Sequence, residues 1–255
     1  MNRLGMDVAQ DLIRDRAQGG VEVVVAMSGG VDSGLVAALA VQAVGSRARA
    51  VTIQSEFVAR QEIAAAKSIA EHVGIRHELL EMHHLESAAV RRNGPDRCYH
   101  CKGRVFERLQ KKFHDAVLCD GTNGDDDPAR PGLKALAERG VMSPLRLAGV
   151  TKANIRSAAK VLGLPNWDRP SESCLATRIP VGTELTVKRL DMVAVMENYW
   201  RGCGVESLRV GHDDLVATVI YMPEYADIMK KNRERFAELI KGIGLRSFRC
   251  TEWNP

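Results

Sequence analysis

The sequence predicts an α/β fold, in which helices cover both faces of a doubly wound parallel sheet, followed by a small α+β domain. Two observations carry this prediction. From about residue 21 to residue 165, short β-branched runs alternate with helical stretches, which is typical of a parallel sheet with crossover helices. From residue 187 onward the order changes to helix, two strands, helix and strand, which indicates a separate, smaller layer structure.

Composition limits the function classes. The 255 residues contain 45% hydrophobic residues and carry a formal net charge of +4, which suits a globular protein and does not demand a nucleic-acid partner. Aromatic residues make up 5%, too few for a base-stacking surface, so we expect no nucleic acid as partner. No apolar run has the length of a membrane span, and no signal peptide precedes the first strand. We therefore expect a cytoplasmic protein whose six cysteines form no structural disulfides.

A glycine-rich turn follows the first predicted strand, Val21–Val25. It reads Ser28-Gly29-Gly30-Val31-Asp32-Ser33 and leads into an alanine-rich helix. Glycine lets the backbone approach a ligand closely, and the free N–H groups of a helix N-terminus favour an anion. Asp32 would repel a bare phosphate, so we expect Mg²⁺ between them. A ligand-free turn capped by serine is the alternative, but SGGxDS between a strand and a helix favours phosphate binding.

The next predicted strands are Ala48–Ser55, Arg76–Met82 and Ala116–Cys119, with helices over Gln61–Val73 and Lys102–Phe113. Ligands of such sheets lie beyond the carboxyl ends of the strands, at the edge where the glycine-rich turn lies. Polar or ligand-facing residues at these strand ends are expected to frame a nucleotide. They are Ile53, Gln54, Asp120, Thr122 and Asn123.

Further along, we predict a short strand at Val141–Leu145 and a helix capped by Thr151. The prolines and small polar residues of 166–186 indicate an ordered loop at a domain boundary. We therefore divide the chain into a nucleotide domain (1–165), a cysteine-bearing linker (166–186) and a C-terminal domain (187–255). The elements predicted for the last part are a helix at Val187–Arg201, strands at Glu206–Gly211 and Leu215–Met222, a helix at Pro223–Lys241 and a strand at Leu245–Cys250.

Three cysteines stand out from the other three. Cys98 and Cys101 form a C-x-x-C pair at the start of a predicted helix, where a thiolate is favoured. Cys174 lies in the polar loop, with Arg178 four residues later, which makes it a candidate low-pKa thiol. Lys102, next to the pair, could stabilise negative charge that develops on a phosphate. A solvated helix face is the alternative interpretation of this lysine.

Together these motifs resemble a known family. The SGGVDS turn, the C-x-x-C pair, DGTN at 120–123, RPGLKAL at 130–136 and SCLATRIP at 173–180 are similar to the LarE-type, ATP-dependent sulfur transferases. The resemblance implies the fold of the PP-loop ATP pyrophosphatases, which is related to the adenine nucleotide alpha hydrolases. It also implies that ATP adenylylates a carboxylate on a pyridinium mononucleotide, with release of pyrophosphate. Sulfur then replaces AMP to give a thiocarboxylate, a step of nickel-pincer nucleotide synthesis.

The resemblance also assigns residues. Cys174 falls on the cysteine that, in one branch of the family, gives up its own sulfur and becomes dehydroalanine. A second branch adds a C-x-x-C pair, which Cys98 and Cys101 match, and its three cysteines hold a [4Fe-4S] cluster that carries an extra sulfide. Arg209 matches a basic position of the C-terminal domain and, with Arg178, is expected to bind substrate. Many members have a second arginine two residues later, where this chain has Gly211.

Ligand chemistry leaves three uses for the cysteines. Three thiolates can hold three corners of a cubane cluster and leave one iron open for sulfide. Zinc would usually require a fourth protein ligand, and a redox pair or a sacrificial thiol needs no metal. We predict a homo-oligomeric sulfur transferase that uses ATP, Mg²⁺, a [4Fe-4S] cluster, an external sulfide donor and a mononucleotide substrate, with Asp32, Lys102 and Cys174 as catalytic residues. The alternatives are a sacrificial-cysteine transferase, a tRNA-thiolating enzyme, an ammonia-using synthetase and a non-enzymatic nucleotide-binding Fe–S sensor.

Overall fold

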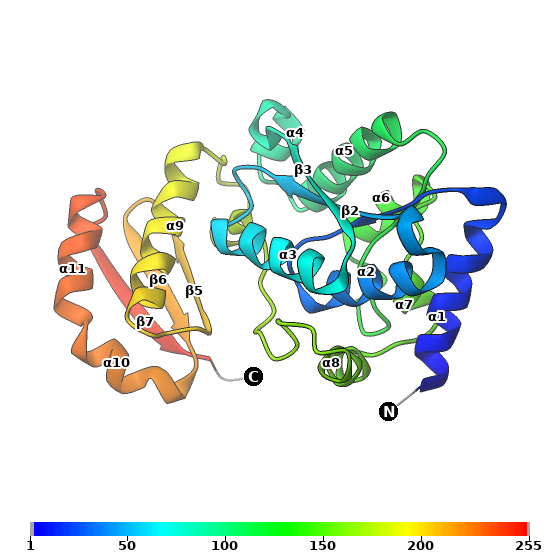
Figure 1. Cartoon of the computed structure of the whole chain (residues 1–255). Coiled ribbons are helices and arrows are strands. Elements are labelled where there is room, and N and C mark those ends of the chain that lie inside the picture. The colour runs from blue at the N-terminus through cyan, green and yellow to red at the C-terminus, as the bar shows by residue number, and fades with distance from the viewer. Residues whose placement is uncertain (1–2, 254–255) are drawn as a thin grey trace. The chain divides into compact units, whose positions relative to one another are not determined.

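A computed structural model describes residues 3–253 (Figure 1). The chain divides into two compact units, each made of two stretches of sequence. The first unit contains the residues up to His83 and Asp96–Ser171, and the second contains His84–Pro95 and the residues from Glu172 onward. The division at residues 165 and 186 that we expect from the sequence stays a prediction about domains.

The first unit is built on a four-stranded parallel sheet with strand order β3-β2-β1-β4, which confirms the predicted fold class. Its strands are β1 (Val23–Ala26), β2 (Ala48–Gln54), β3 (Arg76–Glu81) and β4 (Val117–Cys119). The helices of this unit are α1 (Arg3–Arg16), α2 (Val31–Val44), α3 (Arg60–Val73), α5 (Arg97–Lys112), α6 (Pro131–Glu138), α7 (Pro144–Leu147) and α8 (Lys152–Val161).

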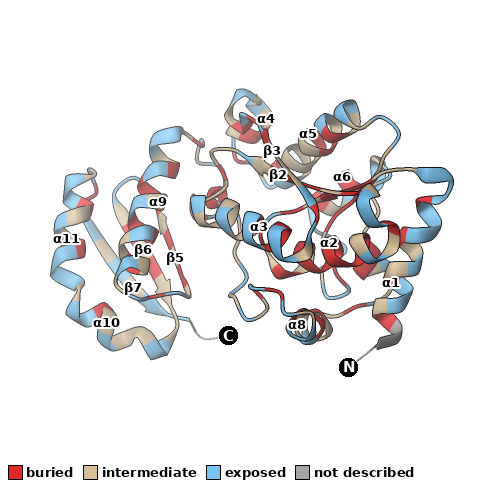
Figure 2. Ribbon diagram, in the orientation of Figure 1, coloured by how far each residue is buried: buried red, intermediate tan, exposed pale blue. Residues whose placement is uncertain are grey.

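Helices pack on both faces of this sheet because alternate residues of the central strand face opposite sides. Val23 and Val25 contact one apolar core, which α1, α2, α3 and α8 share. Val24 lies between them in sequence and contacts a second core with side chains of α5 and α6. Helix α2 is buried on nearly all sides (Figure 2). The apolar residues of 31–44 therefore bury α2 against the sheet, and this packing holds the first turn of the helix at the sheet edge.

The second unit is a three-stranded sheet covered by helices. Strands β5 (Leu208–His212) and β6 (Val216–Tyr221) form an antiparallel hairpin, and β7 (Ser247–Glu252) pairs with β6 in parallel. Trp200 and Phe236 are fully buried in its core. The helices of this unit are α4 (Ala88–Arg91), α9 (Val187–Gly202), α10 (Ala226–Lys231) and α11 (Arg233–Gly242).

Two predicted elements were wrong. Residues 141–145 form no strand, because only Met142 bridges to Cys119 and Pro144 then begins α7. The helix predicted over Pro223–Lys241 is a short 3₁₀ turn followed by α10 and α11, interrupted at Asn232. The Asn232 side chain donates back to the carbonyl of Ile228 (2.9 Å), a local hydrogen bond that competes with helix continuation.

Candidate functional site

The glycine-rich turn lies between β1 and α2, as predicted, and its shape depends on Gly29. This residue has φ +88°, and a Cβ added to it would lie 2.4 Å from the carbonyl oxygen of Glu62 in α3. Only glycine meets both conditions without strain. Ser33, in the first turn of α2, accepts from the Ser28 backbone N–H (3.1 Å) and donates to the Gly30 carbonyl (3.1 Å). The two serine hydroxyls are 3.2 Å apart, so each holds the other in the loop.

Asn166 supports this loop from far along the sequence. Its side-chain amide donates to the Gly29 carbonyl (2.9 Å), across 137 residues of sequence. Asn166 is 5% exposed, and its Oδ1 is a buried polar atom that has no hydrogen-bond partner among the described residues. Sequence reasoning placed this residue in a linker and missed it. An asparagine in a polar loop gives no local signal of such a contact.

Asp32 is paired with a lysine that the sequence analysis also missed. The Lys152 ammonium lies 2.5 Å from one oxygen of Asp32, and the Asn123 side chain donates to the other oxygen (3.4 Å). Lys152 is the first residue of α8, directly after the predicted cap Thr151, whose side chain accepts from the Asn154 backbone N–H. The cap therefore fixes the position from which Lys152 reaches the loop. Both side chains of the ion pair remain partly exposed, at 30% and 25%.

The predicted residues after β4 also lie at this edge. Gly121 packs so closely that an added Cβ would lie 2.7 Å from the Ser33 backbone nitrogen. Asp120 is buried and accepts from Thr122 and from the Ser143 hydroxyl (2.6 Å), with the Lys102 ammonium 3.6 Å away. The hydrogen bonds of Asp120 thus order the end of β4. Lys102 is 40% exposed, so its ammonium group can interact with a negatively charged ligand at this edge.

Near the end of the neighbouring strand β2, Thr52 links Met27, the residue that follows β1, to His77 of β3. Its hydroxyl donates to the Met27 carbonyl (2.7 Å), so the 2.8 Å contact with His77 requires the imidazole Nε2–H to donate to Thr52. Burial and the nearby Lys67 lower the pKa of His77, which favours the neutral ring. The predicted nucleotide contacts Ile53 and Gln54 follow Thr52; Ile53 is half-buried and Gln54 exposed.

The C-x-x-C pair lies within the first turns of α5, because this helix begins at Arg97 and not at Lys102 as predicted. Cys98 is exposed and Cys101 half-buried. The Arg97 guanidinium donates to the Cys98 sulfur, at 3.6 Å. Cys119, in β4, is buried, and this burial raises the pKa of its thiol.

Cys174 belongs to the second unit, so the three predicted ligands are divided between the units. Within residues 3–253, no group of three or more His, Cys, Asp or Glu side chains is placed to hold a metal ion. Cys174 is exposed and directly precedes a 3₁₀ turn, Leu175–Arg178. The cysteines fit iron by their chemistry, since thiolates are the usual ligands of Fe–S clusters.

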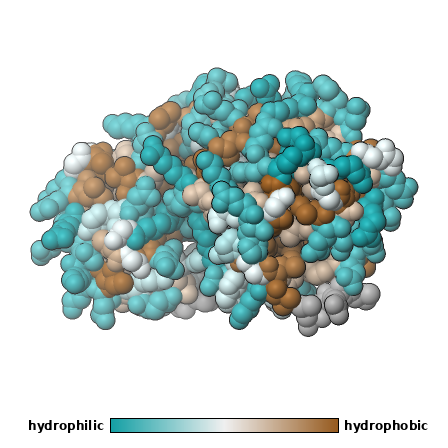
Figure 3. Space-filling view, in the orientation of Figure 1, coloured by the Kyte–Doolittle hydropathy of each residue, from teal (hydrophilic) through white to brown (hydrophobic). Residues whose placement is uncertain are grey.

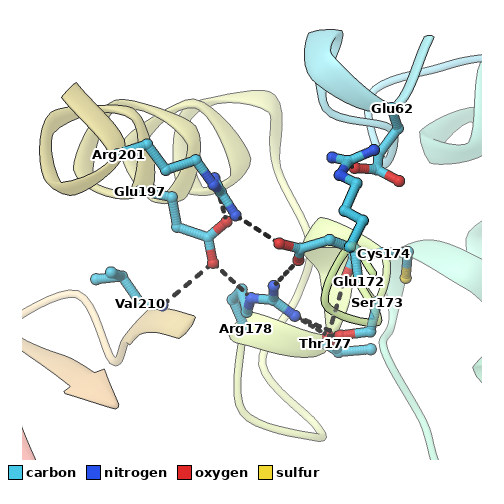
Figure 4. Close-up of polar contacts among 10 residues, drawn as sticks. Glu62, Glu172, Ser173, Cys174, Thr177, Arg178, Glu197, Arg201 and Val210 are labelled. Atoms are coloured by element: carbon cyan, nitrogen blue, oxygen red, sulfur yellow. Dashed lines mark hydrogen bonds and ion pairs between the residues drawn. The ribbon is translucent and has the colours of Figure 1, made fainter. Parts of the chain in front are cut away.

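The two arginines predicted to bind substrate differ in their surroundings. Arg178 is buried, and its guanidinium donates to Glu197, Glu172, Ser173 and Thr177 (Figure 4). The structure thus gives Arg178 four intramolecular partners, and the substrate contact expected from the sequence stays a prediction. Arg209, on β5, is half-buried and lies over the Trp253 ring at 5.3 Å.

Gly211 stands where the family resemblance leads us to expect a second arginine, and the structure gives a reason for the glycine. A Cβ at this position would lie 2.5 Å from the Arg178 carbonyl oxygen, so any larger residue must displace the segment that carries Cys174.

Hydrophilic residues predominate on the face drawn in Figure 3. None of the described helices combines the length and the apolar character needed to cross a bilayer.

Comparison with known proteins identifies relatives for most of the chain. A family model described as asparagine synthase matches residues 7–102. An uncharacterized protein of Synechocystis is 37% identical over 204 residues, 78% of this chain and 76% of the relative. The pyridinium-3,5-bisthiocarboxylic acid mononucleotide synthase of Lactiplantibacillus plantarum is 32% identical over 230 residues, 88% of this chain and 83% of that enzyme.

A glutamine-hydrolyzing GMP synthase of Pyrobaculum aerophilum is 31% identical over 157 residues, 61% of this chain but 28% of that enzyme. This match is confined to a part of each protein, whereas the match to the mononucleotide synthase spans most of both. With the glycine-rich turn between β1 and α2 in place, the longer match decides the family. The chain belongs to the LarE-type, ATP-dependent sulfur transferases of the PP-loop ATP pyrophosphatase superfamily.

Proposed function

We propose that this enzyme converts a carboxylate of a pyridinium mononucleotide into a thiocarboxylate during nickel-pincer nucleotide synthesis. The similarity to the L. plantarum synthase, whose name specifies a bisthiocarboxylic acid mononucleotide, supports this substrate class. The single observation that carries the ATP-dependent step of this reaction is the Asp32–Lys152 ion pair at the glycine-rich turn. This pair places a carboxylate and an ammonium group together at a helix N-terminus, where phosphates bind. Each of the two groups could leave its partner and bind a ligand.

ATP would bind with its phosphates at the free N–H groups of the first turn of α2. Asp32 would hold Mg²⁺, which supplies charge neutralisation of the phosphate oxygens. Lys152 would then leave Asp32 and turn to a phosphate oxygen, while Lys102 adds a second cation. The remaining predicted contacts, Ile53, Gln54, Thr122 and Asn123, would frame the nucleotide.

Two steps follow. A substrate carboxylate oxygen attacks the α-phosphorus of ATP, the bond to the leaving pyrophosphate breaks, and an acyl adenylate forms. A sulfur nucleophile then attacks the acyl carbon, AMP leaves with the bonding electrons, and the thiocarboxylate remains. Activation is needed because a free carboxylate is a poor electrophile. The chain therefore separates phosphate chemistry at Asp32 from sulfur chemistry at Cys174.

For the sulfur source we propose a [4Fe-4S] cluster held by Cys98, Cys101 and Cys174, loaded by an external sulfide donor. When bound, such a cluster would supply the sulfide that attacks the acyl adenylate. The exposure of Cys98 and Cys174 supports this choice of ligands, because exposed thiols are accessible to an incoming cluster. A homo-oligomer in the cytoplasm remains our expectation.

The second candidate is a sacrificial mechanism, in which Cys174 gives up its own sulfur. Cys174 is exposed, as a thiol that gives up its sulfur to a substrate would have to be. Iron and sulfide analysis after anaerobic purification, with a visible spectrum, tests the cluster. Cys98→Ala, Cys101→Ala and Cys174→Ala should each lose most of the iron, because two thiolates rarely hold a cubane. Cys119→Ala, Cys203→Ala and Cys250→Ala serve as controls that keep it.

Intact-mass measurement after turnover separates the two mechanisms. The cluster predicts repeated turnovers with an unchanged chain mass when sulfide is supplied. Dehydroalanine at position 174 and one turnover per chain would overturn the cluster and establish the sacrificial mechanism. To distinguish a non-catalytic nucleotide-binding protein, pyrophosphate release from ATP should be measured with pyridinium-3,5-dicarboxylic acid mononucleotide as the acceptor.

A further inference from the structure

The segment that carries Cys174 is anchored by hydrogen bonds among its own residues. The Cys174 carbonyl accepts from both the backbone N–H (2.9 Å) and the hydroxyl (2.7 Å) of Thr177. The hydroxyls of Ser173 and Thr177 lie 3.0 Å apart. Cys174 itself is exposed, and its side chain points away from these contacts (Figure 4). The backbone around the thiol is therefore held by hydrogen bonds, while the Cys174 side chain is exposed.

Arg178 ties this segment together. Its Nη1 donates to the hydroxyls of Ser173 and Thr177, the two residues that flank the Cys174 turn. Its Nε donates to Glu197 Oε1 (2.7 Å) and its Nη2 to Glu172 Oε2 (3.2 Å). The guanidinium has five N–H donors, and these contacts occupy four of them. Arg178 therefore has little capacity left for a substrate.

Arg201 closes these contacts into a ring of alternating charge. It donates to Glu197 Oε2 (3.1 Å) and to Glu172 Oε1 (2.9 Å), so each carboxylate lies between two guanidinium groups. The backbone N–H of Val210, on β5, also donates to Glu197 (3.2 Å) and attaches the ring to the sheet. The side chains of Arg178 and Glu197 are 2% and 1% exposed. We call Glu172, Arg178, Glu197 and Arg201 the charge ring.

Stability alone is a weak reason for such a ring. Removing two charges from water carries a desolvation penalty that can exceed their attraction, and apolar replacements are often equally stable. Buried charges instead fix the orientation of the groups that they contact, because a guanidinium fork binds carboxylates in only a few geometries. Here the fork also holds both hydroxyls beside Cys174. Gly211 extends the anchoring, since its missing Cβ leaves room for the Arg178 carbonyl.

We propose that Arg178 is a positioning residue for sulfur transfer, which it serves by fixing the direction in which the Cys174 thiol is presented. The inference rests on the proposed function of Cys174, whether that thiol binds a cluster or gives up its own sulfur. Arg178 touches neither ATP nor the reacting atoms. Its loss should therefore affect the sulfur step and leave the adenylylation step intact.

The test compares Arg178→Lys with Arg235→Lys, the same substitution at an exposed arginine of α11. Both half-reactions are measured with pyridinium-3,5-dicarboxylic acid mononucleotide. Arg178→Lys should lower thiocarboxylate formation about 100-fold, the order of loss expected from a small misplacement of a reacting group. Pyrophosphate release and the melting temperature should match those of Arg235→Lys. Hydrogen exchange should be faster at the Thr177 amide in Arg178→Lys only.

Two milder variants test the proposal if Arg178→Lys does not fold. Glu197→Gln keeps the acceptor for Val210 but removes one charge, so it should lie between Arg178→Lys and the wild type in thiocarboxylate formation. Gly211→Ala leaves the charge ring intact but forces the Arg178 backbone to move, and it should lower the same step.

The proposal is overturned if all three variants transfer sulfur like Arg235→Lys, or if pyrophosphate release and the melting temperature fall together with sulfur transfer. Failure of the proposed function is distinguishable, because the wild type would then form no thiocarboxylate.

Discussion

The charged groups at the glycine-rich turn and those at the Cys174 segment are used in opposite ways. At the turn, Lys152 and Asp32 form one ion pair whose side chains are 30% and 25% exposed. In the charge ring, Arg178 and Glu197 are 2% and 1% exposed, and each contacts further partners. An exposed pair contributes little to stability and exchanges partners readily. A buried pair cannot lose one partner without leaving an uncompensated charge.

The difference separates binding from positioning. At the turn, the proposed function requires Asp32 to release Lys152 when Mg²⁺ and phosphate arrive, and the partial exposure of both side chains permits this exchange. In the ring each charge already has partners within the protein, which supports the proposal that the ring holds the Cys174 segment. A charged residue near a reactive group should therefore be judged by its exposure and by its partners before a role in substrate binding is assigned.

The largest effect is expected at the reactive thiol. Cys174→Ala should abolish thiocarboxylate formation, since it removes either a cluster ligand or the sulfur itself. Pyrophosphate release should persist, because the phosphate site lies in the other unit. Product analysis by mass spectrometry checks this, with Cys203→Ala as the control. Thiocarboxylate formed by Cys174→Ala would show that the two regions do not divide the reaction as proposed.

Asp32→Asn tests the exchangeable pair. It keeps the shape of the side chain but removes the charge that would hold Mg²⁺, so pyrophosphate release should fall by about 100-fold or more. The melting temperature should change little, because a partly exposed pair contributes little to stability. Asp115→Asn, at an exposed position of the same unit, is the matched control. Unchanged pyrophosphate release would remove Asp32 from the site.

Lys152→Gln should have a smaller effect on the same reaction. Losing one charge-assisted contact to phosphate should raise the KM for ATP about tenfold. Steady-state kinetics of pyrophosphate release measures it, with Lys134→Gln at an exposed position of α6 as the control. A KM equal to that of the control would mean that Lys152 only neutralises Asp32 and never reaches ATP.

The smallest effect concerns acid stability beside the turn. Since the pKa of His77 is lowered in the folded state, the unfolded chain binds the proton more readily. The stability from the neutral ring is complete above the ordinary pKa of 6.5 and is lost as the pH falls through the folded value.

His77→Gln can still donate to Thr52 but does not titrate. Its melting temperature should therefore fall less than that of the wild type between about pH 7.5 and about pH 5.5. His114→Gln, at an exposed position, is the control. Equal acid sensitivity of His77→Gln and the wild type would contradict this explanation.

Much of the fold was predictable from local patterns. Strands β1 to β4 and the capped helix α8 were predicted close to their limits, because β-branched runs, glycine stops and the Thr151 cap act over a few residues. The two wrong predictions also have local causes. Pro144 begins helix α7 inside the strand predicted at Val141–Leu145. The Asn232 side chain donates to the Ile228 carbonyl inside the helix predicted over Pro223–Lys241. Periodicity cannot weigh such contacts against one another.

The sequence by itself determined the glycine-rich turn, its strand and helix, and the family that these motifs indicate. Only the tertiary structure decided which charges meet: Lys152 reaches Asp32 across 120 residues and Asn166 reaches Gly29 across 137. It also decided that Arg178 is buried in the charge ring. The physical reason is that a local pattern fixes backbone conformation within a few residues, whereas an ion pair depends on packing that brings distant segments together.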